Sequence, residues 1–316
     1  MDIRLISNHD THHAYCMILT KYRVYQGVAL YRSLMYNAGS ARIFILCMDH
    51  ETKELLNQMN LQGVTLIPVS AIEDASIMLI KKDRKINEYC WTLKPVFLIY
   101  ILNSFNNEIK RVTYVDADGC FFTDPNVIFD TQKNCSVLLS KHNYSSNLQY
   151  VEKDAGKYNS GFISFLNDSN GMNTLKWWRD QCFNWCYDRA ENGKFGDQKY
   201  LETMPRLFNK VCDITTPGVN IGPWNDLYST PRILDGKVYL NNDSLIFYHF
   251  AGLRIISENE LVYILGFNKL LKEHVYYPYI SVIKKVIDDI RKIDPDFYGF
   301  YDRAGLRGKK HHKLVN

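Results

Sequence analysis

Long hydrophobic segments are missing from this sequence of 316 residues. The longest unbroken apolar run, Val96 to Leu102, is far shorter than the ~18 residues that a membrane-spanning helix needs. Residues 1–15 also lack an apolar stretch of signal-peptide length, so we expect a protein that folds in the cytosol. Glycine and proline are ordinary in number and no fixed-period repeat is visible, which excludes fibrous and repeat architectures.

Closely paired cysteines are missing too. The eight cysteines are scattered along the chain, and none forms a Cys-x-x-Cys pair. Structural zinc sites need closely spaced ligands, and disulfide frameworks are typical of short secreted chains. The sequence therefore predicts eight reduced thiols in the core, with Cys182 and Cys186 on one face of a helix.

A large excess of charge of one sign is absent as well. The 38 basic and 34 acidic residues give a net charge of +4, and residues 304–316 carry four Lys or Arg and no acid, so the rest of the chain is neutral. Nucleic-acid-binding proteins usually spread basic residues over a folded face, so we expect no nucleic-acid partner. The basic tail fits either a solvated end or a weak peripheral contact with an anionic membrane surface or an acidic partner.

What the sequence does have is a hydrophobic content of 46%, enough for a large core, and a regular alternation of segments. Strand candidates lie at 15–20, 41–48, 64–69 and 111–115, and helix candidates at 25–36, 51–59 and 93–103, while 73–85 fits a helix or a loop. Pro95 would stand in the first turn of the last helix. This alternation predicts an α/β fold with a mixed, mostly parallel sheet covered by helices on both faces.

The rhythm changes after about residue 120. Strands are expected at 136–140, 161–166 and 245–250, a helix at 172–189, and a hairpin around Asn241 and Asn242. From residue 258 onward the pattern is helical, and an apolar stripe over 280–293 predicts a helix that packs on the body or, as the alternative, lies in a membrane plane. We divide the chain into a catalytic domain at 1–255, a helical extension at 256–303 and a basic tail at 304–316.

The segment from Arg111 to Pro125 reads RVTYVDADGCFFTDP, an apolar strand that ends in two carboxylates. Asp116 and Asp118 are two residues apart, so in an extended chain their side chains point the same way, at the edge of the sheet where α/β proteins bind ligands. Two close carboxylates repel each other unless a cation lies between them, and a divalent cation with a diphosphate is the usual partner. A simple strand-end turn is the alternative interpretation.

In its context this segment resembles the donor-site motif of glycosyltransferases with a GT-A fold, in particular family 8, which includes glycogenin and lipopolysaccharide galactosyltransferases, and its bacterial relatives. Further short motifs at 159–161 (NSG), 196–198 (GDQ) and 249–252 (HFAG) follow in the family's order. The resemblance spans about residues 15–255. It implies a GT-A fold and a metal-dependent glycosyltransferase that moves a sugar from a nucleotide-diphosphate donor, a UDP-sugar with retention, to a glycan, lipid-linked or protein acceptor.

The resemblance also assigns roles to residues. Asp116, Asp118 and His249 would hold Mn²⁺ or Mg²⁺, with Mn²⁺ favoured by the imidazole nitrogen. Asp197 and Gln198 would be the catalytic pair beside the anomeric carbon, although Gly-Asp-Gln is also typical of a helix start. The further candidates for donor binding are Thr20, Tyr22, Arg23, Tyr25, Lys94, Ala117, Asn159, Gly161, Gly252 and Arg254, together with the two aspartates.

Two features depart from the family pattern. Family 8 members usually follow the late histidine motif with Lys-Pro-Trp, whereas Leu253 and Arg254 stand here, so Arg254 is the candidate for binding diphosphate. The usual arginine on the helix before the metal-binding strand is also missing, and Lys94 is the nearest candidate for its place. The Gly- and Pro-containing loop 217–225, with an apparently exposed Trp224, would either shape an acceptor site or form a structural turn.

Two other function classes are open to this pattern. Haloacid-dehalogenase-like phosphatases also place Asp-x-Asp after a strand, but they need a hydroxyl residue where Cys120 stands and a later acidic pair at a strand end. Asp288 and Asp289 lie instead on an amphipathic helix. A non-catalytic sugar-nucleotide-binding protein of the same fold would lack the metal ligands that this chain retains. The sequence therefore favours a glycosyltransferase.

Overall fold

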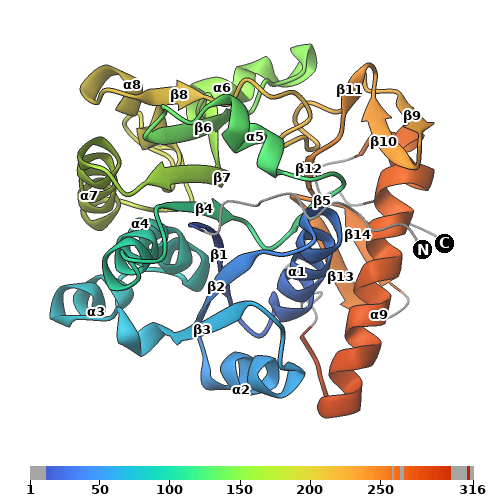
Figure 1. Cartoon of the computed structure of the whole chain (residues 1–316), viewed down its shortest axis with the longest axis horizontal. Helices are drawn as coiled ribbons and strands as arrows, with labels where there is room; N and C mark the ends of the chain where they lie inside the picture. The colour runs from blue at the N-terminus through green and yellow to red at the C-terminus, as the bar shows by residue number, and fades with distance from the viewer. Residues whose placement is uncertain (1–11, 258–259, 264–266, 300–311, 314–316) are drawn as a thin grey trace.

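A computed structural model describes residues 12–257, 260–263, 267–299 and 312–313 of the chain. Its centre is a seven-stranded sheet with the strand order β3-β2-β1-β4-β7-β6-β8 (Figure 1). The strands are β1 His13–Leu19, β2 Arg42–Cys47, β3 Val64–Pro68, β4 Arg111–Val115, β6 Val137–Lys141, β7 Tyr158–Leu166 and β8 Val211–Asp213. Only β7 runs antiparallel to its neighbours, β4 and β6. The predicted mixed, mostly parallel sheet is confirmed.

Helices cover both faces of this sheet. The side chains of β1 alternate between two cores, because successive residues of a strand point to opposite faces: Met17 packs with α1 and α2, whereas Cys16 packs with α4. On one face lie α1 Val24–Ala38, α2 His50–Met59 and α9 Tyr277–Ile293, and on the other α3 Ala75–Lys81, α4 Ile86–Ser104 and α7 Ser169–Asn184. Burial on both faces explains why the strands read as unbroken apolar runs.

The remaining elements are short. The strands are β5 Gly119–Phe121, β9 Pro231–Leu234, β10 Lys237–Leu240, β11 Asp243–Ser244, β12 Phe247–His249, β13 Leu253–Ser257, β14 Glu260–Tyr263 and β15 His312–Lys313. The α-helices are α5 Asn126–Thr131, α6 Gln149–Ala155 and α8 Met204–Leu207, with 3-10 turns η1 Val69–Ala71, η2 Ser146–Leu148, η3 Lys199–Glu202 and η4 Lys269–Leu271 and a π-helical turn η5 Lys272–Tyr276. The expected hairpin around Asn241 is present as β10 and β11.

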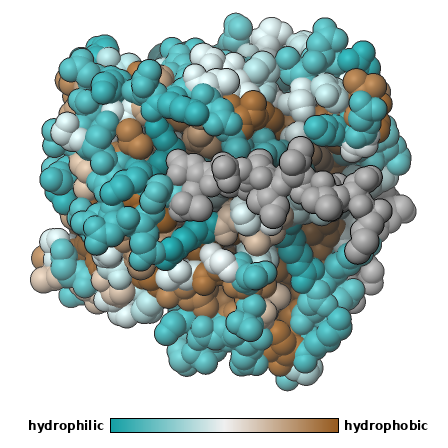
Figure 2. Space-filling view, viewed as in Figure 1, coloured by the Kyte–Doolittle hydropathy of each residue, from teal (hydrophilic) through white to brown (hydrophobic). Residues whose placement is uncertain are grey.

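The helix α9 runs alongside α1, and its end lies next to α2 (Figure 1). Its apolar stripe, which includes Ile283 and Ile287, is buried against the body, as the packing interpretation predicts. Across the described residues, no helix combines the length and the apolarity that a membrane crossing would need. On the face seen in Figure 2, hydrophilic side chains predominate and hydrophobic ones form scattered patches.

Three local predictions about the helices and the C-terminal region were wrong. Pro95 lies in the interior of α4, because this helix begins nine residues earlier, at Ile86, where Glu88 accepts a hydrogen bond from the Lys85 N–H. The helix α7 ends at Asn184, so Cys182 lies in it and Cys186 beyond it.

The region after residue 258 is not wholly helical, since β14 pairs with β13. Within the basic tail, β15 pairs with β14, and the rest of the tail lies outside the described residues.

The prediction of eight reduced cysteines was wrong for one pair. Cys135 and Cys212 form a disulfide, with their Cα atoms 5.9 Å apart. The parallel pairing of β6 with β8 explains it. Val137 lies opposite Val211, and each cysteine is within two residues of this pair. They are 77 residues apart in sequence, so no local spacing reveals the pair. The other six cysteines are free.

Candidate active site

The candidate site lies where the strand order of the sheet reverses. From β1 the chain proceeds to β2 and β3 on one side, while β4 pairs with the other side of β1. Ligands of open α/β sheets bind outside the carboxyl ends of the strands at such a switch point. Asp116 follows β4 directly, and the loop containing Thr20 and Arg23 follows β1, so both segments border this crevice.

The pairing of two short strands brings His249 to the aspartates. β5 and β12 are antiparallel, and Gly119 lies opposite His249 in their register. A Cβ atom on Gly119 would come within 2.0 Å of the Phe247 ring, so only glycine permits this approach. Asp118 and His249, which are 131 positions apart in the sequence, are thereby brought into one site.

Asp116, Asp118 and His249 form a cluster in which the three potential ligand atoms all lie within 4.8 Å of one another. His249 Nε2 is 3.0 Å from Asp118 Oδ1 and 3.9 Å from Asp116 Oδ2. A Cβ on Gly161 would lie 2.6 Å from both Asp116 Oδ2 and His249 Cε1, so glycine keeps this space open. Two carboxylates and one imidazole are a donor set that suits Mn²⁺ or Mg²⁺, and these residues therefore fit a divalent cation.

The electrostatics of the cluster favour a positive charge between the carboxylates. Burial raises the pKa of Asp118, but His249 and Arg23 outweigh it and hold this pKa well below its usual range. Burial lowers the pKa of His249, but the adjacent Asp118 and Asp116 carboxylates outweigh it, and the net pKa is raised. A bound divalent cation would take the place of the imidazole proton, so cation binding should release a proton.

Lys94 lies beneath the cluster and is almost completely buried, at 1% exposure. Its Nζ is 3.2 Å from Asp116 Oδ1 and 3.2 Å from Asp197 Oδ2, and it donates to Ser160 Oγ at 3.0 Å. Burial disfavours the charged form of Lys94, but the two carboxylates outweigh it and raise the pKa well above its usual value. Lys94 therefore joins Asp116 to Asp197, and its role in donor binding stays a prediction.

Asp197 is 3% exposed, and burial raises the pKa of its carboxyl despite the attraction of Lys94. Its neighbour Gln198 donates from Nε2 to the Ala155 carbonyl at 2.7 Å. The structure thus brings Asp197 to the cluster through Lys94, whereas the Gln198 amide is turned toward the end of α6. The placement of Gln198 beside a reacting carbon stays a prediction.

Three residues of the site were not singled out from the sequence. Asn220 Oδ1 lies 3.4 Å from His249 Nδ1, and Asn220 Nδ2 donates to Asn159 Oδ1 at 3.2 Å. His142 Nε2 lies 3.2 Å from Asn159 Nδ2, and burial lowers the pKa of His142 to about 4. Ser160 contacts Lys94. Ser160 stands in the NSG motif, so the motif itself was a signal, whereas nothing local marks His142.

Trp224 is buried, at 8% exposure, and the prediction that it is exposed was wrong. Its ring makes edge-to-face contacts with His249 and His142, with centroid distances of 5.2 and 5.3 Å. Together with Asn220 it shows that the loop 217–225 supports the metal cluster. Both histidines are thus held between aromatic and amide groups, which fixes the orientation of the His249 imidazole.

The expected donor-binding residues are placed unequally. Arg23 donates to Asp118 Oδ2 at 3.4 Å, and Tyr22 is half exposed beside it. Tyr25 is completely buried in the core under α1, so its side chain packs there and is not available to a nucleotide. Arg254 adds to the positive field on Asp118. The other candidates lie on segments next to the cluster: Thr20 directly follows β1, Ala117 lies between the aspartates, and Gly252 follows β12 with a φ of +87°.

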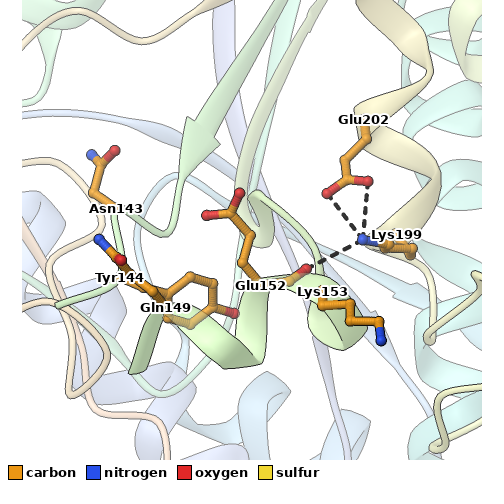
Figure 3. A pocket seen from close by; sticks show the side chains of 7 residues that line it. All are labelled: Asn143, Tyr144, Gln149, Glu152, Lys153, Lys199 and Glu202. Atoms are coloured by element: carbon orange, nitrogen blue, oxygen red, sulfur yellow. Dashed lines mark hydrogen bonds and ion pairs between the residues drawn. The ribbon is translucent and has the colours of Figure 1, made fainter. Parts of the chain in front are cut away.

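A cavity of about 610 Å³ opens on the β6 side of the site. Its polar lining includes Tyr144, Glu152, Lys199 and Glu202, and the Lys199 ammonium lies between the Glu202 carboxylate, 3.0 Å away, and the Glu152 carbonyl (Figure 3). Lys199 directly follows Gln198 in the chain. Such a lining suits a ligand rich in hydroxyl groups, because carboxylates and ammonium groups complement hydroxyl donors and acceptors.

No family model matches the sequence. The chain is 44% identical over 294 residues to the uncharacterized protein YfnF of Bacillus subtilis strain 168, which covers 91% of this chain and 97% of YfnF. It is 30% identical over 286 residues to YfnD of the same strain, covering 89% and 91% of the two chains. The chain belongs to the family of YfnF and YfnD. Both relatives are uncharacterized, so membership of this family assigns no activity to the chain.

Solved structures identify the fold of this family. The galactosyltransferase LgtC, in complex with donor and acceptor sugar analogs, is similar over 86% of this chain and 95% of its own, with a TM-score of 0.53 and 12% identity. The bifunctional glycosyltransferase WbbM matches 91% of this chain and 52% of its own, with a TM-score of 0.53 and 14% identity. The YfnF family thus has the GT-A glycosyltransferase fold, as the sequence predicted.

The acidic pair that a phosphatase would need is not provided by α9. Asp289 pairs with Arg32 and with Lys292, at 2.6 Å in each case, on the outer side of the helix.

Proposed function

We propose that this protein is a metal-dependent glycosyltransferase that uses a nucleoside diphosphate sugar, with UDP-sugars as the first donors to test. The observation that carries the proposal is the cluster of Asp116, Asp118 and His249 at the switch point of a GT-A fold. Asp197, which is linked to the cluster through Lys94, adds a second group of the expected kind. The choice of uridine and retention of configuration rest on the family 8 resemblance.

The residues would divide the reaction as follows. Asp116, Asp118 and neutral His249 would hold the cation, which would supply Lewis-acid stabilisation of the departing diphosphate. Lys94 keeps Asp116 and Asp197 at fixed positions and offsets the repulsion between their charges. Asp197 would accept hydrogen bonds from hydroxyls of the transferred sugar, because its carboxylate is joined to the cluster through Lys94. The nucleoside would lie toward β1 and β2, near Tyr22 and Arg23.

We place the acceptor, a glycan or glycolipid, on the opposite side of the cluster, in the cavity that contains Glu152 and Lys199. This placement follows from the order along the carboxyl edge of the sheet: the loop after β1, the metal cluster after β4, and the cavity after β6. With an acceptor that supports transfer, Glu152→Gln should raise the KM for that acceptor and leave the Kd of the donor unchanged. An unchanged acceptor KM would place the acceptor elsewhere.

The decisive experiment screens nucleotide sugars with and without Mn²⁺ and measures the release of nucleoside diphosphate. Wild-type protein should release it only with the cation, and Asp118→Asn should lower the rate at least 100-fold. The matched control is Asp180→Asn, which alters a half-exposed aspartate paired with Arg179 on α7. Release of free phosphate from a phosphomonoester would instead indicate a phosphatase, and cation-dependent binding without release would indicate a sugar-nucleotide-binding protein.

A further inference from the structure

The segment that follows α9 forms one wall of a second cavity in the same crevice. This cavity has a volume of about 280 Å³. One wall consists of Lys21 and Tyr22, in the loop after β1, and of Glu51 in the first turn of α2. The opposite wall consists of Asp296, Phe297 and Tyr298. The cavity therefore lies at the carboxyl ends of β1 and β2, on the nucleoside side of the metal cluster.

The position of this segment is fixed by packing. The buried stripe of α9 holds the helix against α1 and α2, and the chain turns after Ile293, where the Phe297 N–H donates to the Asp294 carbonyl at 3.1 Å. The Phe297 ring is 6% exposed and belongs to the core. A Cβ on Gly299 would lie 2.8 Å from the Lys21 carbonyl, so the segment passes directly over the donor loop.

The groups that face this cavity suit a nucleobase. Tyr22 and Tyr298 line the cavity and are 48% and 79% exposed, so it has two accessible aromatic residues on which a base could stack. The Glu51 and Asp296 carboxylates can accept hydrogen bonds from base N–H groups, and the Glu51–Lys21 pair, 3.2 Å long and exposed, is weak enough to open. Small-molecule sites usually measure ~300–1,000 Å³, so this cavity suits a nucleoside and not a whole sugar nucleotide.

The loop after β1 also joins this cavity to the metal cluster. Tyr22 lines the cavity, and Arg23, the next residue, reaches Asp118 Oδ2 at 3.4 Å. A ligand whose base occupies the cavity would therefore extend its phosphates along this loop toward the cluster. A monosaccharide in the cavity could also stack on tyrosine. It has no phosphates that would extend along the loop to the cluster, so it would not account for the connection between the two.

We propose that the segment Asp294–Gly299 completes the nucleobase subsite of the donor, and that Tyr298 contributes to it by stacking on the base. This inference rests on the proposed function, since it assumes that the donor is a nucleotide. It makes the C-terminal extension part of the donor site, so that α9 positions a substrate-binding wall in addition to covering the sheet.

The test compares UDP with inorganic pyrophosphate, which can bind the cation but has no base. Calorimetric titrations with Mn²⁺ use the full-length wild-type chain, Tyr298→Ala and Tyr36→Ala. If UDP binds weakly, CDP, ADP and GDP replace it as the titrated nucleotide. Tyr36 is a matched control, because it is also 79% exposed but lies near the opposite end of α1 from the donor loop. Base stacking on an aromatic ring is worth ~1–3 kcal/mol, so Tyr298→Ala should weaken nucleotide binding by about 5- to 150-fold.

The expected result is a loss of nucleotide affinity in Tyr298→Ala alone, with pyrophosphate binding equal in all three proteins. Nucleotide affinity unchanged in Tyr298→Ala, or UDP bound no better than pyrophosphate by wild-type protein, would overturn the nucleobase subsite and leave the metal-dependent transferase standing. A loss of pyrophosphate binding in Tyr298→Ala would also overturn it, since the residue would then act through the cluster. Failure of the wild-type protein to bind any nucleotide or pyrophosphate with Mn²⁺ would instead overturn the proposed function. Thermal unfolding of each variant checks that folding is intact.

Discussion

Lys94 and Asp197 form an ion pair of 3.2 Å in which the two residues are 1% and 3% exposed. Lys94 also pairs with Asp116. One buried ammonium group thus interacts with the carboxylate that directly follows β4 and with the carboxylate from the loop before η3. Removing one partner from such a network leaves a buried charge without compensation, which is far more costly than losing an exposed pair.

We therefore predict that Lys94→Met lowers the free energy of unfolding by about 3–5 kcal/mol and abolishes activity. The control is Lys133→Met, since the Lys133–Asp130 pair is exposed on both sides and such pairs contribute ~0–1 kcal/mol. Urea unfolding measures both variants. Equal, small effects of the two substitutions would show that Lys94 does not hold the buried carboxylates together.

The Cys135–Cys212 disulfide joins the starts of β6 and β8 across 77 residues. Replacing both cysteines by serine should lower the free energy of unfolding by about 2–4 kcal/mol, because the crosslink restricts the unfolded chain. Activity should be retained, since the site lies at the other end of β6. A reducing agent should lower the unfolding midpoint of the wild-type protein and leave that of the double variant unchanged; a wild-type midpoint that ignores the reductant would contradict the assignment.

Asp226 links the C-terminal extension to the strand that carries His249. It accepts a hydrogen bond from Tyr248 at 2.6 Å, and burial raises its pKa from the ordinary 3.8 to about 6. The folded protein therefore binds this proton more tightly than the unfolded chain, so the stabilising contribution of this group is fully present below about pH 4 and is lost as the pH rises through about 6. This contribution amounts to at most about 3 kcal/mol.

Asp226→Asn keeps the hydrogen-bond acceptor for Tyr248 and cannot ionise. We predict that this variant is more stable than the wild-type protein at pH 7.5 and equally stable near pH 4. Unfolding free energies across this range measure the difference. Parallel pH profiles for the two proteins would refute the role of Asp226.

The sequence was sufficient to predict the sheet and the proximity of Asp116, Asp118 and His249. Each half of the cluster carries its own signal: Asp116 and Asp118 end an apolar strand, and His249 begins a recognisable motif. Buried strands such as β1 and β4 are long apolar runs whose identity depends little on distant contacts. The features that local patterns did not reveal depend on long-range pairing.

Four features depend on such long-range pairing: the burial of Trp224, the burial of Tyr25, the disulfide and the strand β14. Trp224 looks exposed in its Gly- and Pro-rich loop, and only its packing on His249 buries it. Tyr25 falls on the core face of α1 because the helix begins at Val24, a boundary that the sequence does not determine to within one residue. The wall formed by Tyr298 depends on where α9 docks, which no local motif encodes.

The central claim is that Asp116, Asp118 and His249 hold a divalent cation that the donor diphosphate requires. Calorimetric titration of UDP into wild-type protein and His249→Gln, each with Mn²⁺ and with a chelator, tests it most directly. The account predicts that wild-type protein binds UDP only with Mn²⁺, that binding releases protons, and that His249→Gln weakens it by about 10- to 100-fold or more. Equal UDP affinity with Mn²⁺ and with the chelator, or an unchanged affinity in His249→Gln, would contradict it.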